Sequence, residues 1–259
     1  MTKNYISKNK NKNPSAFDFF GSDDYRHNKN ELFKIFKNLD LDNVRMLDNL
    51  ALFFDPKYLS RILFFNQIYN KILDVPGFIV ELGCQYGSST ALFQSLRDIY
   101  EPYNRTRKIF AFDTFEGLKG VTKKDKNLKS GDFKTINKNY NKILEKILNI
   151  KENFGAIPHY PRTEIYKGDV KYTFNKFIKE HPELVLSLVF FDMDIYKPTF
   201  DVLVKIKKYL TKGSVLVFDE ICDELSPGET HALREAIGLR NIKLQRWQYN
   251  SRLTYCIID

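Results

Sequence analysis

The sequence has little cysteine and no long apolar run, and each absence excludes a class of protein. Its three cysteines, Cys84, Cys222 and Cys256, are widely spaced and include no C-x-x-C pair. Neither a disulfide framework nor a zinc knuckle is therefore expected. No stretch approaches the roughly 20 consecutive apolar residues that span a bilayer, so no membrane insertion is expected. We expect a protein of the reducing cytoplasm.

The first 14 residues also contain few apolar side chains, because lysine and asparagine dominate them. Such a segment buries too little surface to offset the entropy cost of ordering, and it lacks the apolar core of a signal peptide. We expect residues 1–14 to form a disordered tail. The remainder of the 259 residues, at 43% hydrophobic composition overall, is enough for one large domain with an appendage.

The formal net charge of +9 is compatible with several anionic partners. Nucleic acid, an anionic membrane and an anionic small molecule all attract a basic protein. The lysines are spread along the whole chain instead of forming one basic run, and no aromatic-rich RNA-binding motif accompanies them. The charge alone does not choose among these partners.

The period of the apolar residues changes near residues 75–77, which divides the chain into two parts. Residues from about Asn30 to Leu73 predict three helices, and the last begins near Pro56. The predicted apolar face of this last helix consists of Leu59, Ile62, Leu63, Ile68 and Ile72. We expect an N-terminal helical cap at residues 15–74 and a second domain at residues 75–259.

In the second part, short strands alternate with helices. Strands are predicted at residues 78–82, 108–112, 163–167, 186–191, 214–218, 242–246 and 253–258, and helices at residues 88–99, 170–180, 199–210 and 229–238. This alternation predicts an α/β fold with a doubly wound, mostly parallel seven-stranded sheet. The last two strands leave no room for a helix and should pair antiparallel at one edge. A helical insertion at residues 116–161, with a lysine-rich helix near residues 133–153, is expected to act as a lid.

Two pairs of acidic residues follow apolar runs that predict buried strands. Asp192 and Asp194 follow one run, and Asp219 and Glu220 follow another. The carboxyl ends of parallel strands meet at the edge where open α/β sheets bind ligands. Four carboxylates in one crevice repel unless a cation or a proton lies among them, and hard oxygen ligands suit Mg²⁺, Mn²⁺ or Ca²⁺. The pattern predicts a metal-assisted reaction.

The ends of the first three strands predict a nucleoside pocket. Gly83 and Gly87 are spaced for a sharp turn into a helix, where a side chain would collide with a ligand lying across the backbone. The loop is neither a G-x-G-x-x-G motif nor a P-loop. Asp113 is placed to accept hydrogen bonds from both hydroxyls of a ribose, and Asp169 to accept one from an adenine amino group.

Together these segments resemble the class I S-adenosylmethionine-dependent methyltransferases. More narrowly, they are similar to the metal-dependent sugar O-methyltransferases of the macrocin and novobiocin type. The matching segments are residues 74–89, 112–118, 191–199 and 217–220. The resemblance covers roughly residues 59–259, with one departure, because relatives usually have Asp-Asp where this chain has Asp219-Glu220.

The resemblance implies an S-adenosylmethionine site, a Mg²⁺ or Mn²⁺ site and a general base. It implies that Asp194 is the base and that Asp192, Asp219 and Glu220 coordinate the metal ion. The residues expected around the methyl donor are Glu81, Gly83, Tyr86, Gly87, Ser88, Asp113, Thr114, Phe115, Asp169 and Asp192. His231, close after the acidic pair at residues 219–220, is a candidate for an auxiliary base or a substrate contact.

Structural alternatives remain for several of these residues. A helix cap or a turn would account for any single acid among Asp113, Asp169, Asp192 and Asp194, although not for the whole acidic set. Similarly, His231 could be a surface or capping residue. Trp247 and Arg252 either pack the edge strands or form a rim for a nucleotide base.

The favoured function is Mg²⁺-dependent transfer of a methyl group from S-adenosylmethionine to a sugar hydroxyl. The expected acceptor is a nucleotide-linked sugar destined for a surface polysaccharide or a glycoside, and the resemblance implies a homo-oligomer. One alternative is a catechol-type O-methyltransferase of small molecules. The other is an RNA methyltransferase or nucleic-acid-binding protein, which the absence of an RNA-binding motif disfavours.

Overall fold

The computed structural model describes residues 23–249 and 252–259, and the predicted tail at residues 1–14 lies outside them. The chain divides into two compact units, residues 1–59 and residues 60–259. The described part of the first unit contains α1 (Asp23–Asn38), α2 (Asn43–Asp48) and the 3-10 turn η2 (Leu50–Phe53). Helix α3 (Pro56–Lys71) runs across the division between the units. The predicted ranges 15–74 and 75–259 stay predictions.

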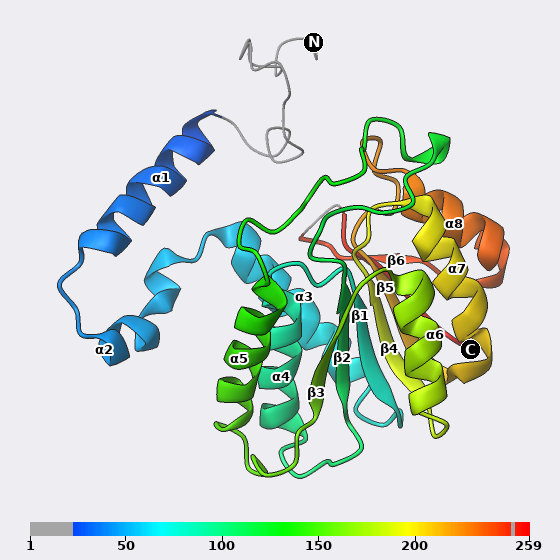
Figure 1. Ribbon diagram of the computed structural model, residues 1–259, viewed down its shortest axis with the longest axis horizontal. Coiled ribbons are helices and arrows are strands. Elements are labelled where there is room, and N and C mark those ends of the chain that lie inside the picture. The colour runs from blue at the N-terminus through cyan, green and yellow to red at the C-terminus, as the bar shows by residue number, and fades with distance from the viewer. Residues whose placement is uncertain (1–22, 250–251) are drawn as a thin grey trace. The chain divides into compact units, whose positions relative to one another are not determined.

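The second unit is built on a seven-stranded sheet in the order β3-β2-β1-β4-β5-β7-β6, as Figure 1 shows. Its strands are β1 (Phe78–Leu82), β2 (Ile109–Asp113), β3 (Thr163–Lys167), β4 (Leu186–Phe191), β5 (Leu210–Phe218), β6 (Gln245–Arg246) and β7 (Thr254–Ile257). The first five strands run parallel, and β7 pairs antiparallel with both β5 and β6. The predicted doubly wound, mostly parallel sheet is confirmed.

Helices cover both faces of this sheet. The helices that follow α3 are α4 (Ser88–Tyr100), α5 (Tyr140–Glu152), α6 (Val170–Glu180), α7 (Tyr196–Ile206) and α8 (Gly228–Ala236). Helices α3, α4 and α5 lie on one face and α6, α7 and α8 on the other (Figure 1). Because each face carries its own apolar core, every residue of β1 and β4 is buried. Strands buried on both faces require continuous apolar runs, which is the pattern in the sequence.

The predicted apolar face of α3 is partly wrong. Ile68 and Ile72 are buried, but Leu59 and Leu63 are 47% and 48% exposed. The helix instead buries Phe64 and Phe65, which are adjacent in sequence and therefore widen the buried face. Two large rings bury more apolar area than two leucines, so they decide the orientation of the helix.

Several element boundaries also differ from the prediction. Helix α7 begins at Tyr196 instead of residue 199 and ends at Ile206, and β5 already begins at Leu210. The lysine-rich helix of the insertion is shorter than predicted, spanning Tyr140–Glu152, and β6 consists of only two residues. Among the described residues, no helix has the length and apolarity to cross a membrane.

Candidate functional site

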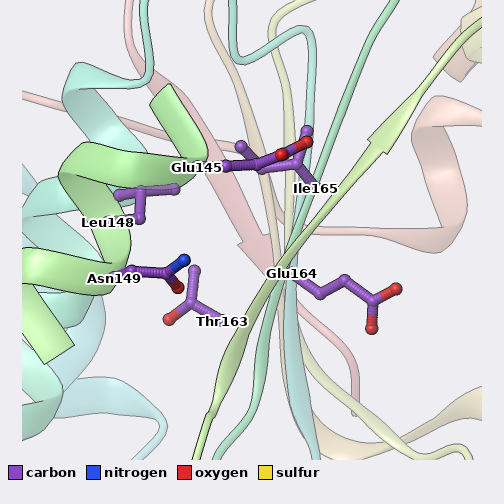
Figure 2. A pocket seen from close by; sticks show the side chains of 6 residues that line it. All are labelled: Glu145, Leu148, Asn149, Thr163, Glu164 and Ile165. Carbon is purple, nitrogen blue, oxygen red and sulfur yellow. The ribbon is translucent and has the colours of Figure 1, made fainter. Parts of the chain in front are cut away.

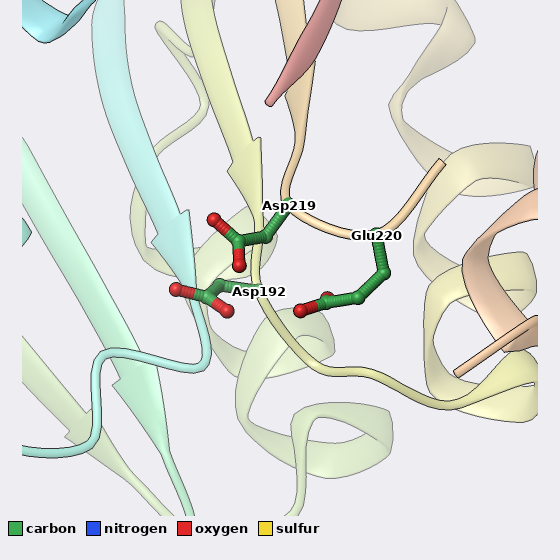
Figure 3. A group of neighbouring side chains, drawn as sticks. All are labelled: Asp192, Asp219 and Glu220. Atoms are coloured by element: carbon green, nitrogen blue, oxygen red, sulfur yellow. The ribbon is translucent and has the colours of Figure 1, made fainter. Parts of the chain in front are cut away.

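The acidic residues meet because backbone hydrogen bonds continue past the ends of three adjacent strands. The Asp192 N–H donates to the Leu82 carbonyl at 2.8 Å, and the Asp219 N–H donates to the Phe191 carbonyl at 3.1 Å. Carboxylate oxygens of Asp192, Asp219 and Glu220 lie within 4.8 Å of one another. Figure 3 shows these three side chains turned toward one another at the carboxyl ends of β4 and β5.

A cation already lies beside these acids, and it is an arginine of α3. The Arg61 guanidinium donates to Asp219 Oδ1 at 2.5 Å and to Asp192 Oδ2 at 2.9 Å. It also stacks over Phe65 and Phe190, at 5.2 and 5.4 Å from their ring centroids. Burial alone would lower the pKa of Arg61, but the two carboxylates raise it above its usual range. The charge of this arginine is therefore permanent.

A second arginine pairs with the third acid of the cluster. Arg252 Nη2 hydrogen-bonds Glu220 Oε1, and Arg252 Nε lies 3.2 Å from a carboxylate oxygen of Asp223. The other oxygen of Glu220, Oε2, is buried and has no hydrogen-bond partner among the described residues. A buried carboxylate oxygen without a partner is costly, so this atom points to a missing cation or donor.

The carboxylates of Asp192, Asp219 and Glu220 are suitable ligands for a hard divalent cation. Arg61 bonds one oxygen of Asp192 and one of Asp219, and Arg252 bonds one of Glu220. One oxygen of each carboxylate is therefore not used by an arginine. Burial, and then the neighbouring carboxylates, raise the pKa of Glu220 well above its usual range. Three converging carboxylates with spare oxygens suit Mg²⁺ or Mn²⁺.

Asp194, the predicted general base, lies two residues beyond Asp192 in a left-handed backbone conformation with φ +61°. Burial, together with the charge of Asp219, raises the pKa of Asp194 to about 7. A carboxyl group with that pKa can accept a proton near neutral pH. His231, the auxiliary candidate, lies on α8, where its Nδ1 is 2.6 Å from Arg234 Nη2.

Strained backbone marks the same edge of the sheet. Besides Asp194, positive φ values occur at Gln85 (44°), Phe115 (55°) and Cys222 (63°), in the loops that follow β1, β2 and β5. Non-glycine residues in this region persist only where the surroundings enforce the conformation, and they concentrate at functional sites. The carboxyl edge of the sheet is therefore the candidate site.

The two glycines after β1 are required by contacts within the protein. A Cβ on Gly83 would lie 1.9 Å from the Asp192 carbonyl oxygen, and one on Gly87 would lie 2.3 Å from the Leu144 side chain. Both glycines have positive φ values. The predicted reason for these glycines, a collision with a bound ligand, is therefore not needed to explain them. Their contacts with the methyl donor stay a prediction.

Asp113, at the end of β2, hydrogen-bonds the loops around the predicted S-adenosylmethionine site. Asp113 Oδ2 accepts from the Gln85 N–H at 2.8 Å, and Asp113 Oδ1 accepts from the Phe115 N–H at 2.5 Å. Burial raises the pKa of Asp113. Thr114 completes the turn, because its hydroxyl donates to the Gly117 carbonyl. These contacts are those of a turn residue, which was the structural alternative for Asp113. Each Asp113 oxygen also keeps a second lone pair that can accept a hydrogen bond from a ribose.

The other residues predicted around the methyl donor lie in β1, in the loop after it and at the start of α4. Buried Glu81 accepts a hydrogen bond from the Thr90 hydroxyl on α4, whose first residue is Ser88. Burial raises the pKa of Glu81 to about 7. Tyr86 packs edge-on against Tyr140 of the insertion, with ring centroids 5.1 Å apart. These side chains surround the loop after β1.

Asp169 is a helix cap, as its structural alternative predicted. It precedes α6, and its Oδ1 accepts from the Lys171 N–H at 2.8 Å. Trp247 likewise packs in the core, 8% exposed, with Phe64 at 5.7 Å between ring centroids. Arg252, by contrast, bonds Glu220 and so lies beside the acidic residues. Neither of its two predicted roles, packing of the edge strands or a rim for a nucleotide base, had placed it there.

Two residues of the acidic site were missed from the sequence. Glu229, at the start of α8, is fully buried and accepts from the backbone N–H groups of Met193 and Glu220, both at 3.2 Å. It thus ties the loop after β4 to the loop after β5. The sequence offered one signal for Glu229, an acid in a predicted first helical turn. The second missed residue is Arg61, which nothing in the sequence distinguished from a solvated arginine.

One end of the insertion is fixed to the two helices beside the acidic site. Asp125 is fully buried and accepts from the Thr122 N–H and hydroxyl and from the Tyr196 N–H. Lys124 lies 3.7 Å from the centroid of the Tyr196 ring and pairs with Glu235 on α8. The predicted lid is therefore anchored at the 3-10 turn η3 (Lys123–Asp125).

A pocket also lies between α5 and the edge strand β3, away from this site. It is lined by Glu145, Leu148, Asn149, Thr163, Glu164 and Ile165, and Figure 2 shows Glu164 pointing away from α5. None of the predicted site residues lines it, and it faces the first three residues of the strand instead of its carboxyl end. It carries no functional assignment.

Comparisons with known proteins identify the family of the chain. The family model described as Macrocin-O-methyltransferase (TylF) matches residues 60–241. The calicheamicin methyltransferase CalS11 is 33% identical, with a TM-score of 0.88 over 92% of this chain and 93% of its own. No curated protein matches the chain.

Two further solved structures are similar. The apo structure of CalS11, described as a TDP-rhamnose 3′-O-methyltransferase of calicheamicin biosynthesis, is 32% identical, with a TM-score of 0.82 over 92% of this chain and 95% of its own. The O-methyltransferase NovP is 19% identical, with a TM-score of 0.56 over 77% and 79% of the two chains, and shares the fold. The family match extends from α3 to the 3-10 turn η5 (Leu239–Asn241) and so includes every predicted site residue.

Proposed function

This chain belongs to the macrocin O-methyltransferase family, and we propose that it methylates a hydroxyl group of a nucleotide-linked sugar. It is an S-adenosylmethionine-dependent O-methyltransferase. The observation that carries the proposed acceptor is the 32% identity, over nearly the whole chain, to an enzyme described as acting on TDP-rhamnose. The net charge of +9 supports an anionic acceptor.

The methyl donor would lie over the loops after β1, β2 and β3. Asp113 would accept hydrogen bonds from the ribose hydroxyls through its remaining lone pairs, and Asp169 would accept one from the adenine amino group. Buried Glu81, with its raised pKa, would face the positively charged part of the donor, where a cation stabilises the carboxylate. The sulfonium supplies the activated methyl group, so the protein needs no covalent intermediate.

The acceptor hydroxyl is a weak nucleophile until its proton is removed. Asp194 would take that proton as the oxygen attacks the methyl carbon, and its pKa of about 7 suits this role at neutral pH. Glu229, which bonds the backbone of both neighbouring loops, would hold the base loop in place. His231, on α8, would serve as an auxiliary base or a contact to the acceptor.

Asp192, Asp219 and Glu220 would hold Mg²⁺ or Mn²⁺. Such a cation would stabilise the negative charge that develops on the acceptor oxygen, by several kcal/mol. The buried and unpartnered Oε2 of Glu220 supports this proposal most directly. The longer side chain of Glu220, compared with the usual aspartate, still brings an oxygen to within 4.8 Å of the other two ligands.

We place the reaction in the cytoplasm, in the synthesis of a surface polysaccharide or a glycoside. Cys84, Cys222 and Cys256 are all within the described residues and are free thiols, which is typical of a reducing compartment. A second copy of the chain is the proposed protein partner. Ile143, Ile147 and Ile150 support it, because they form an exposed apolar stripe along α5.

A mass-spectrometric screen of nucleoside diphosphate sugars tests the proposal. The purified chain is incubated with S-adenosylmethionine and Mg²⁺, and each sugar is examined for the gain of one methyl group. We expect a methylated product with the native chain and none with Asp194→Asn. If chelation leaves the yield unchanged, the metal proposal is wrong. If catechols gain a methyl group and the nucleotide sugars do not, the proposed acceptor is wrong.

A further inference from the structure

Arg61 and Arg252 bond only one of the two oxygens of each carboxylate in the proposed metal site. The two terminal nitrogens of Arg61 bond Asp219 Oδ1 and Asp192 Oδ2, one oxygen of each carboxylate. Arg252 bonds Oε1 of Glu220, again one oxygen of two. The buried Glu220 Oε2 has no partner among the described residues. The arginines thus hold each proposed metal ligand from one side.

We infer that Arg61 is a positioning residue for the proposed divalent-cation site. Its guanidinium fixes one oxygen each of Asp192 and Asp219, so that the other two oxygens can meet a cation together with Glu220 Oε2. The inference rests on the proposed function, because it presupposes that a cation binds there. The positioning acts between two loops, since Asp192 follows β4 and Asp219 follows β5.

The geometry of a guanidinium suits this task. Two half-buried carboxylates within 4.8 Å of each other repel and would rotate apart without a partner. A planar fork with two parallel N–H groups bridges them at a fixed angle, which the single charge of a lysine cannot reproduce. The guanidinium carbon lies over the rings of Phe65 and Phe190, at 5.2 and 5.4 Å from their centroids, and Ser89 Oγ lies 3.4 Å from Nη2.

A different role, in which Arg61 occupies the cation position and must leave, makes the opposite prediction. A guanidinium and a divalent cation repel, so removal of a competing arginine would tighten metal binding. The balance of charge favours coexistence. The carboxylates of Asp192, Asp219 and Glu220 converge, and Glu229 bonds the backbone of the same two loops, whereas two guanidiniums face this group of four acids.

Binding of Mn²⁺ to Arg61→Lys tests the inference. Lysine keeps the positive charge and therefore keeps most of the repulsion, so this variant isolates the effect of the fork. Titrations of the full chain, followed by the electron paramagnetic resonance of free Mn²⁺, give the dissociation constant without reference to activity. We expect roughly 10–100-fold weaker binding in Arg61→Lys, the range found when groups that orient metal ligands are changed. Arg240→Lys, at an exposed position, should leave the affinity unchanged.

Equal or tighter Mn²⁺ binding by Arg61→Lys would overturn the inference alone. If the native chain binds no Mn²⁺, the metal proposal is lost together with it. A role in stability only would lower the melting temperature of the variant without changing the affinity, which also counts against the inference.

A crystal structure of the native chain with Mn²⁺ provides a second measurement that does not depend on the folding of the variant. We expect Arg61 to remain hydrogen-bonded to Asp192 and Asp219 while Mn²⁺ contacts their other oxygens. A guanidinium that has left both carboxylates in the presence of Mn²⁺ would overturn the inference.

Discussion

A Cβ placed on Gly83 would lie 1.9 Å from the backbone carbonyl oxygen of Asp192. The glycine loop after β1 therefore touches the acidic loop after β4 backbone to backbone. The Asp192 N–H bonds the Leu82 carbonyl immediately before Gly83, which fixes the same contact from the other side. The proposed donor site and the proposed metal site thus share one junction, and neither can shift independently of the other.

We predict that Gly83→Ala destabilises the protein and weakens donor binding together. Alanine would have to adopt φ +95° and displace the Asp192 carbonyl. The left-handed conformation and the overpacking together cost roughly 3–5 kcal/mol of unfolding free energy. Urea unfolding measures that loss. Calorimetric titration with S-adenosylmethionine should show affinity at least about tenfold lower, since a shift of about 1.4 kcal/mol suffices.

Gly131→Ala is the matched control for this substitution. Gly131 has nearly the same conformation, with φ +89°, but an added Cβ would meet no atom within 4 Å. Gly131→Ala should lower the unfolding free energy by only about 1–2 kcal/mol, the cost of the left-handed conformation itself. Equal losses in the two variants would show that the contact with Asp192 is unimportant.

The raised pKa of Glu81 predicts that donor binding depends on pH. Its pKa of about 7 means that the free protein holds much of this side chain protonated below neutrality. A cationic donor prefers the carboxylate, so binding releases a proton and tightens as pH rises. If only the ionised form binds, affinity should increase roughly eightfold between about pH 6.0 and pH 7.5.

Titration calorimetry across this pH range measures the effect, and Glu81→Gln supplies the control. Glutamine has no proton to release, so its affinity should be lower and independent of pH over the same interval. A pH profile that persists in Glu81→Gln would assign the dependence to another group, such as Asp113.

Two substitutions of Asp169 separate its two roles. Serine also caps helices, so Asp169→Ser should retain the stability that Asp169→Ala loses, about 1 kcal/mol. Both variants lack the carboxylate proposed to bind the adenine amino group, and each should bind S-adenosylmethionine about tenfold less tightly, for a lost hydrogen bond of about 1–1.5 kcal/mol. Native affinity in Asp169→Ser would leave this residue as a helix cap only.

The sequence was sufficient to predict the sheet because the central strands are buried on both faces. The bounds of the runs at Thr163–Lys167 and Leu186–Phe191 agree with the structure at both ends. Boundaries beside special residues were less reliable. The helix predicted at residues 199–210 already begins at Tyr196, whose N–H donates to the Asp125 carboxylate. That acid lies 71 residues earlier in the chain, so no local pattern contains it.

Glu229, in the first turn of α8, was missed, but the other acids of the site were predictable, because each follows a strand whose end is apparent in the sequence. Their cationic partners were not. Arg61 belongs to a helix whose face was predicted from leucine spacing, and its burial depends on Phe65 beside it and on Phe190 in a strand far along the chain. An arginine that contacts two rings and two carboxylates has the same local sequence as one in solvent. Only the tertiary structure distinguishes them.

The anchor of the insertion predicts unequal effects for two neighbouring residues. Asp125→Ala removes the acceptor of two backbone N–H groups, those of Thr122 and Tyr196, in a fully buried position. Donors left without partners there should cost about 2–4 kcal/mol in urea unfolding. Lys124→Ala removes an exposed ion pair with Glu235 and should lower the unfolding free energy far less than Asp125→Ala does.

The same pair of variants shows whether the anchor matters for the proposed acceptor site. A Cβ on Gly228 would lie 2.5 Å from Asp125 Oδ1 and 2.7 Å from the Asp194 carbonyl oxygen, so the anchor and the backbone of the proposed base both pack against Gly228. Asp125→Ala should therefore lower kcat for the methylated sugar more than it changes S-adenosylmethionine affinity, and it should expose the insertion to limited proteolysis. If Lys124→Ala has as large an effect as Asp125→Ala on stability and kcat, the surface ion pair holds the insertion and the buried aspartate does not.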